Sequence, residues 1–271
     1  MPTPTVDSEF SFELLVCRWA ELGWPPTEGG TVDASDATSS DAADPPVIVS
    51  RQLGTQRRRW DTIVIECDPD GLAARREFGG REIDGDLLPI VRHAPAEWAY
   101  YRDALPDPGY PWRYVREAIH RAAARGLVHK RKHGNRIEIK RKRPYPDWVE
   151  RIVAVENKPD LDASAAAALS DQLEHDVTTA LADEVWLATG CTGERVEPAL
   201  LRQFPVEAGV LTFDFEGSDG LGVDADAATV DWLPSEFDVT APSDRFDAAE
   251  KARRRRLLAE RAYGKGWRSI T

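Results

Sequence analysis

Hydrophobic residues recur at helical spacing near the start of the chain and form short apolar runs further on. Phe10–Leu22 places its apolar side chains on one helical face. Val47–Leu53 and Asp61–Glu66 have the pattern of short strands. The sequence Asp-Pro-Asp-Gly at residues 68–71 favours a turn after the second strand. Residues 72–94 have no clear periodicity and predict no element.

Between residues 96 and 143 the pattern changes to two helices followed by two strands. Ala96–Leu105 and Pro111–Arg125 have the apolar spacing of helices. Leu127–Lys132 and Arg136–Lys142 flank a His-Gly-Asn sequence, which predicts a β-hairpin. Two helices followed by a cationic hairpin resemble a winged helix in which the hairpin is the wing.

The last part of the chain alternates strands and helices. Arg151–Glu156 is a hydrophobic strand, and a helix that Asp162 or Ser164 caps continues to about Leu181. The remaining predictions are a strand at Glu184–Thr189, a short helix at Pro198–Gln203, a strand at Gly209–Phe215, an acidic irregular segment at 216–245 and a charged helix at Ala248–Tyr263. This order predicts the α/β (mixed) class, with a central mixed sheet flanked by helices.

The composition limits the class of protein. The chain has 271 residues, of which 42% are hydrophobic, enough for one large domain or two modest ones. No apolar run approaches the roughly 18 residues of a membrane span, so we expect a cytoplasmic protein without a membrane partner. Cys17, Cys67 and Cys191 are not spaced like a zinc site or a disulfide framework.

Charge is distributed unevenly along the chain. The net charge is −12, and such an acidic excess is typical of a chain adapted to high salt. Cations nevertheless gather in two clusters. The first is at residues 129–143, where Glu138 is the only acidic residue. The second is at residues 245–268, and we interpret it as a solvated helix face. The first cluster predicts contact with the nucleic-acid backbone. Its predicted binding residues are Lys130, Arg131, Lys132, Arg136, Lys140, Arg141, Lys142 and Arg143.

Two opposite charges end the strand at Arg151–Glu156. Side chains alternate along a strand, so Glu156 and Lys158 share a face and leave the strand end side by side. Charges near a core normally pair or bind something charged. With a second carboxylate this pair could hold a divalent cation and orient a water against a phosphate. The sequence Glu138-Ile-Lys140 has the same spacing, but it lies in the hairpin and is interpreted as an ordinary hairpin pair.

The order of helix, strand, strand with Asp61, strand with Glu156-x-Lys158, helix and strand resembles the PD-(D/E)XK nuclease superfamily. The resemblance covers residues 10–66 and 148–215 and implies a restriction-endonuclease-like core. It implies that Asp61 and Glu156 bind Mg²⁺ (or Mn²⁺). It further implies that Lys158 orients the attacking water or stabilises charge on the phosphate. Glu66, on the other face of the Asp61 strand, is the alternative acidic partner.

Two further positions match this superfamily more loosely. Glu13 lies where some members carry an accessory acidic metal ligand. Gln172 matches the first half of a Gln-x-x-x-Tyr motif, in which Asp176 replaces the tyrosine. The chain as a whole also resembles a haloarchaeal protein family of unknown function.

These patterns predict three parts and one leading function. Residues 8–90 and 144–235 form the nuclease-like core, 91–143 the winged-helix-like insertion and 236–271 a charged helix and tail. The leading hypothesis is a Mg²⁺-dependent nuclease that hydrolyses DNA phosphodiester bonds, with RNA as an open alternative partner and no predicted oligomeric state. The alternatives are a non-catalytic winged-helix DNA-binding protein or regulator on a degenerate nuclease-like scaffold, and a protein-interaction module.

Overall fold

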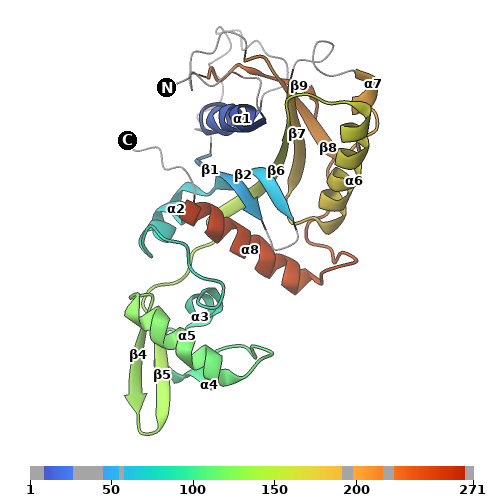
Figure 1. The fold of residues 1–271 in the computed structure, drawn as a ribbon. Helices are drawn as coiled ribbons and strands as arrows, with labels where there is room; N and C mark the ends of the chain where they lie inside the picture. Colours follow the sequence, from blue (N-terminus) through green and yellow to red (C-terminus); the bar gives the residue numbers. More distant parts are fainter. Residues whose placement is uncertain (1–8, 27–44, 55–57, 191–197, 216–222, 266–271) are drawn as a thin grey trace. The chain divides into compact units, whose positions relative to one another are not determined.

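The computed structural model describes residues 9–26, 45–54, 58–190, 198–215 and 223–265. The chain divides into two units (Figure 1). Unit 1 combines Met1–Asp68 with Val149–Thr271, and unit 2 is Pro69–Trp148.

The parts expected from the sequence are distributed between these units. The expected insertion at 91–143 lies inside unit 2, and the C-terminal helix lies in unit 1. The expected domain start at residue 8 and the tail after residue 265 lie outside the described residues.

A six-stranded mixed sheet forms the centre of unit 1 and confirms the predicted mixed α/β class. Its order is β1-β2-β6-β7-β8-β9. The strands are β1 (Val47–Gly54), β2 (Arg59–Cys67), β6 (Val149–Lys158), β7 (Glu184–Gly190), β8 (Ala208–Phe213) and β9 (Ala228–Trp232). β6, β7 and β8 are parallel, whereas β1–β2, β2–β6 and β8–β9 are antiparallel pairs.

Helices cover both faces of this sheet (Figure 1). α1 (Glu9–Gly23) packs on one face, and α6 (Ala163–Thr179) packs on the other together with the short α7 (Pro198–Leu201). α8 (Ala248–Lys265) lies on the α6 side against β1, β2 and β6. Asp162 caps α6, because its carboxylate accepts the backbone N–H of Ala165 at 2.7 Å.

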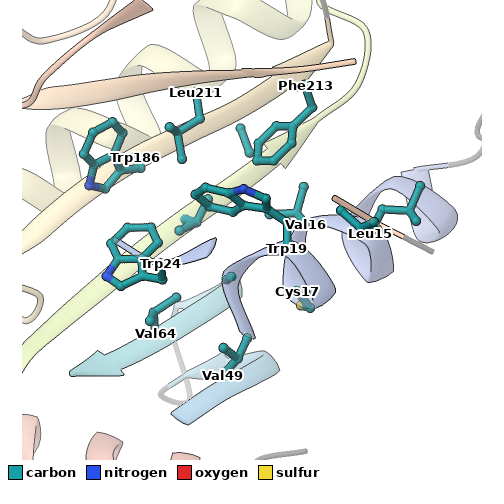
Figure 2. Packing of buried hydrophobic residues seen from close by; sticks show 14 of the residues in the cluster. Leu15, Val16, Cys17, Trp19, Trp24, Val49, Val64, Trp186, Leu211 and Phe213 are labelled. Carbon is teal, nitrogen blue, oxygen red and sulfur yellow. The ribbon is translucent and has the colours of Figure 1, made fainter. Parts of the chain in front are cut away.

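Tryptophan and phenylalanine rings hold α1 on its face of the sheet (Figure 2). The Trp19 ring meets the Phe213 ring edge to face, with centroids 5.1 Å apart, and the Trp24 ring with centroids 5.9 Å apart. Val64 and Val153 complete this cluster from β2 and β6. Large aromatic side chains bury much apolar surface, so this packing fixes the position of α1 over the neighbouring strands.

Unit 2 contains a small three-stranded antiparallel sheet of order β3-β5-β4. Its elements are α2 (Pro69–Arg76), α3 (Leu88–His93), β3 (Ala99–Tyr100), α4 (Tyr101–Ala104), α5 (Trp112–Ala124), β4 (Val128–His133) and β5 (Arg136–Arg141). The predicted hairpin is confirmed as β4–β5. Gly134 adopts φ +59° in its turn, a backbone conformation that glycine tolerates best.

Four local predictions are wrong. The turn expected at 68–71 is the start of α2, where Pro69 fits a first helical turn because its missing N–H would be unpaired there. α3 occupies part of 72–94, where no element was expected. The helix expected at Ala96–Leu105 is confined to α4 (Tyr101–Ala104), since Ala99 and Tyr100 pair with β5 as β3. The irregular segment at 216–245 contains β9.

Two further findings concern membranes and thiols. No helix within the described ranges has the length and apolar character needed to cross a bilayer. Cys17 and Cys67 are buried cysteines, and burial raises the pKa of the Cys17 thiol to about 12. Cys191 lies outside the described residues.

Candidate active site

Asp61 and Glu156 meet because β2 and β6 are antiparallel neighbours. Thr62 of β2 pairs with Val155 of β6, so the residues just beyond this pair lie at the same edge of the sheet. The backbone N–H of Asn157 donates to the Asp61 carboxylate at 3.1 Å where the strand ladder ends. Two residues far apart in the sequence are therefore brought together by strand pairing.

Glu156 is buried and holds a hydrogen-bond donor on each carboxylate oxygen. Its side chain is only 3% exposed. The Gln172 side-chain amide, on α6, donates to Oε2 at 2.7 Å, and Arg58 Nη2 donates to Oε1 at 2.5 Å. The structure thus brings three of the expected residues together: Asp61, Glu156 and Gln172.

Arg58 is a site residue that the sequence prediction missed. Its guanidinium also binds Asp176 of α6, with Nε–Oδ1 at 2.8 Å and Nη2–Oδ2 at 2.5 Å. A signal for it existed, because Asp176 lies one helical turn after Gln172 among the apolar positions of α6. A carboxylate on a buried helix face requires a cation or other donors, and Arg58 supplies them.

The environment of Glu156 changes its acidity. Burial raises its pKa to about 8, and the nearby charges of Asp61 and Asp176 act in the same direction, while Arg58 opposes them. This carboxyl group therefore exchanges its proton near neutral pH, in the range where a general acid or base operates.

Glu13 joins the site through Gln52 of β1. Gln52 Nε2 donates to Glu13 at 2.6 Å and to Asp61 at 3.1 Å. Gln52 has φ +52°, a left-handed backbone that strains a side-chain-bearing residue and turns this amide toward both carboxylates. Arg51 also donates to Glu13, at 3.2 Å. Burial raises the Glu13 pKa, against the lowering effect of the Gln52 hydrogen bond.

Lys158 lies at the same end of β6, but its direct partner is Glu9 in the first turn of α1. Burial by itself lowers the pKa of this ammonium. The hydrogen bond that Lys158 donates to Glu9 and the charges of Glu9, Asp61 and Glu156 outweigh burial, so the Lys158 pKa is raised. Lys158 is therefore a protonated cation within the electrostatic reach of both carboxylates.

Two interpretations of acidic residues are corrected. Glu66 lies at the opposite end of β2, where it accepts hydrogen bonds from Trp24 at 2.7 Å and from Arg151 at 2.8 Å. It is therefore not the partner of Glu156. Glu138 and Lys140 do not pair with each other, because Glu138 binds Arg131 and Lys140 contacts Glu97.

The carboxylate oxygens of Asp61 and Glu156 are the kind of ligand that a hard divalent cation prefers. Across the described ranges, no group of three or more His, Cys, Asp and Glu side chains is arranged to hold a metal ion. Mg²⁺ often takes only one or two carboxylates, with waters and substrate phosphates completing its shell. Each oxygen of this pair holds one donor and retains acceptor capacity. Arg58 would compete with a cation for Glu156.

The predicted hairpin cations differ in their partners. Some are committed within unit 2: Lys130 contacts His120, Arg131 binds Glu138, Lys140 contacts Glu97, Arg143 binds Glu77, and Arg136 lies over the Tyr100 ring. Lys132, Arg141 and Lys142 have no carboxylate partner among the residues that the structure describes, and all three are exposed. These three are the cations most available to a phosphate backbone.

The chain was compared with known proteins. Neither the curated proteins nor the solved structures gave a match. A family model described as a family of unknown function (DUF5787) matches residues 48–271, a range that includes Asp61, Glu156, Lys158 and Gln172 and begins after α1. Because this match covers most of the chain, the protein belongs to the DUF5787 family.

Proposed function

We propose that this protein is a divalent-metal-dependent nuclease that hydrolyses DNA phosphodiester bonds. The observation that carries the proposal is the meeting of Asp61 and Glu156 at neighbouring strand ends, within electrostatic reach of the Lys158 ammonium. Hard oxygen ligands beside a cation are the groups that phosphoryl chemistry requires.

In this proposal each residue of the site has a defined task. Asp61 and Glu156 would hold Mg²⁺ or Mn²⁺, which when bound supplies an acidified water and neutralises charge on the phosphate. Gln52 and Gln172 orient the two carboxylates through their side-chain amides. Lys158 would place its positive charge against a phosphate oxygen, a task suited to a compact ammonium.

The arrangement of elements supports a restriction-endonuclease-like core with a winged-helix-like insertion. In unit 1, α1 covers one face of the β1-β2-β6-β7 portion of the sheet, and α6 follows the strand that carries Glu156. In unit 2, α2 is followed by the order helix, strand, two helices and hairpin, in which β4–β5 would be the wing. Lys132, Arg141 and Lys142 would hold the backbone of DNA without reading its sequence.

The proposal is tested by incubating the full chain with plasmid and labelled linear DNA in Mg²⁺ or Mn²⁺. Asp61→Asn, Glu156→Gln and Lys158→Met should each lower the cleavage rate by on the order of 100-fold. Glu150→Gln is the matched control, because Glu150 is an exposed carboxylate on the same strand as Glu156. Equal cleavage by the wild type and all four variants would exclude this site.

One observation favours a second candidate function, a non-catalytic DNA-binding protein on a nuclease-like scaffold. Arg58 already neutralises Glu156 and Asp176, so the carboxylates form a closed ion-pair network. Binding of DNA that persists in EDTA, without cleavage in either metal ion, would favour this alternative.

A further inference from the structure

An arginine-lined pocket of about 540 Å³ lies in unit 1 and shares Arg58 with the candidate active site. Its volume is within the range of small-molecule sites, about 300–1,000 Å³. The cationic or potentially cationic residues of its lining are Arg58, Arg245, Arg253, Arg254, Arg261 and His175. Among the described residues that line it, none is Asp or Glu.

Four segments supply this lining, and the β1–β2 region contributes Arg58 and Trp60. α8 contributes Arg253, Arg254 and Arg261, and the segment just before α8 contributes Arg245. His175 comes from α6, on the same helix as Gln172. The chain has a net charge of −12, so the convergence of these cations in one pocket runs against its overall charge.

The pocket arginines are only partly neutralised by the protein. Glu250 accepts hydrogen bonds from Arg253 at 2.6 Å and from Arg254 at 2.7 Å. Arg261 donates to the backbone carbonyl of Gly54, and the Arg245 guanidinium contacts His175 Nε2 at 3.0 Å. Arg245 and Arg261 have no carboxylate partner in the described part of the chain. A bound anion would therefore supply the negative charge that balances these two guanidinium groups.

Trp60 forms part of the wall of this pocket. It is only 1% exposed, yet its indole N–H has no hydrogen-bond partner among the described residues. A buried indole N–H normally finds an acceptor. The Arg58 guanidinium lies 5.6 Å from the centroid of the Trp60 ring, so cation and ring form one wall.

We infer that this pocket binds the terminal nucleotide of a nucleic-acid strand through its phosphate. Arginine matches phosphate geometry with paired hydrogen bonds, and Phe246 adds aromatic surface for a sugar or base. The volume suits one nucleotide and excludes a duplex. The inference rests on the proposed function for the nature of its ligand, and it extends that function by assigning a preference for phosphorylated strand ends.

The test measures binding of a short, singly labelled DNA strand to the full chain by fluorescence anisotropy in EDTA. Strands with a 5′-phosphate, a 3′-phosphate or hydroxyl groups at both ends are compared. The wild type should bind one phosphorylated strand roughly tenfold more tightly than the hydroxyl strand, as charge-assisted hydrogen bonds require. Equal affinity for all three strands would overturn the inference.

Two double variants assign this preference to the pocket. Arg245→Ala with Arg253→Ala removes two exposed pocket arginines, one of them paired with Glu250, and should abolish the phosphate preference. Arg202→Ala with Arg18→Ala removes the same charge elsewhere in unit 1, again with one arginine paired, here with Glu21. This control should keep the preference, and identical behaviour of the two double variants would refute the pocket assignment.

Competition separates a strand end from a free small ligand. If inorganic phosphate or a nucleoside monophosphate displaces the phosphorylated strand at the affinity of the strand itself, the ligand is a free nucleotide and the strand assignment fails. Because EDTA prevents metal-dependent cleavage, the readout is independent of catalysis. Asp61→Asn should lose cleavage and keep the phosphate preference, so failure of the proposed function and of this inference are distinguishable.

Discussion

The guanidinium of Arg58 lies 2.5 Å from a carboxylate oxygen of Glu156, although 98 positions separate the two residues. The same guanidinium holds Asp176, and the two carboxylate side chains are 3% and 1% exposed. One cation therefore compensates two buried carboxylates. Hydrogen bonds and charges from both raise the Arg58 pKa despite its burial, so it stays protonated.

Arg58→Leu should destabilise the protein by about 3–5 kcal/mol, because it leaves two buried carboxylates without their cation. Urea unfolding at neutral pH measures the change. Adding Asp176→Asn should restore part of the loss, since one of the two charges is then gone. Arg18→Leu is the control: its pair with Glu21 is on the surface and should contribute less than about 1 kcal/mol. Similar unfolding midpoints for Arg58→Leu and Arg18→Leu would contradict the prediction.

The pH dependence of stability should reveal Glu156. Its pKa is about 8 in the folded protein against 4.5 as the ordinary value. Between these values the folded state binds more protons than the unfolded chain, so the contribution of Glu156 to stability falls as pH rises from 4.5 to 8. It then levels off. Glu156→Gln removes this titration, so the Tm of the variant minus that of the wild type should increase across this window. A constant difference from pH 4.5 to 9 would argue against the buried carboxyl.

Gln52→Gly tests the amide that joins Glu13 to Asp61. Glycine accepts the positive φ of this position, and the relief of about 1 kcal/mol should offset much of the lost hydrogen bonding. We therefore expect near wild-type stability in urea, with DNA cleavage reduced about tenfold because two carboxylates lose their shared donor. A stable variant with unchanged cleavage would remove Gln52 from the site.

Hairpin cations without a carboxylate partner in the described residues should contribute more to DNA affinity than hairpin cations that have one. Replacing Lys132, Arg141 and Lys142 with Gln should lower DNA affinity. The slope of the logarithm of the binding constant against the logarithm of salt concentration should become shallower by roughly 0.9 per lost phosphate contact. The matched triple, Arg131, Lys140 and Arg143 to Gln, should have the smaller effect because these residues already contact Glu138, Glu97 and Glu77. Affinity measured at several salt concentrations distinguishes the two, and equal slopes would show that the available cations are not the contacts.

Regular periodicity made most of the fold predictable from the sequence. The apolar runs of β2, β6 and β7 and the helical stripe of α6 are local patterns that tertiary packing reinforces. β3 was not predictable in this way, because Ala99 and Tyr100 are extended through pairing with β5 rather than through their own propensity. Tertiary pairing overrides a weak local preference.

The candidate site was predictable only in part. The i, i+2 spacing of Glu156 and Lys158 and the earlier Asp61 identified residues that strand pairing then gathered. Arg58 and Gln52 gave no motif, since the importance of Arg58 depends on the side chains of α6 and that of Gln52 on one left-handed backbone angle. The partner of Lys158 also depended on α1, which no spacing along β6 reveals.

Cys67 pairs with Val149, so the chain leaves the sheet and returns to it at one place, with Pro69–Trp148 between. The antiparallel strands β2 and β6 are therefore connected by unit 2, which takes the place of a short turn and is itself folded. Loop closure becomes only about 0.6 kcal/mol harder with each doubling of length, so such an insertion barely burdens the pairing of β2 with β6. If the proposed function holds, replacing Pro69–Trp148 with a short turn should keep Asp61 and Glu156 adjacent on β2 and β6, and leave a nuclease core without the proposed DNA-binding hairpin.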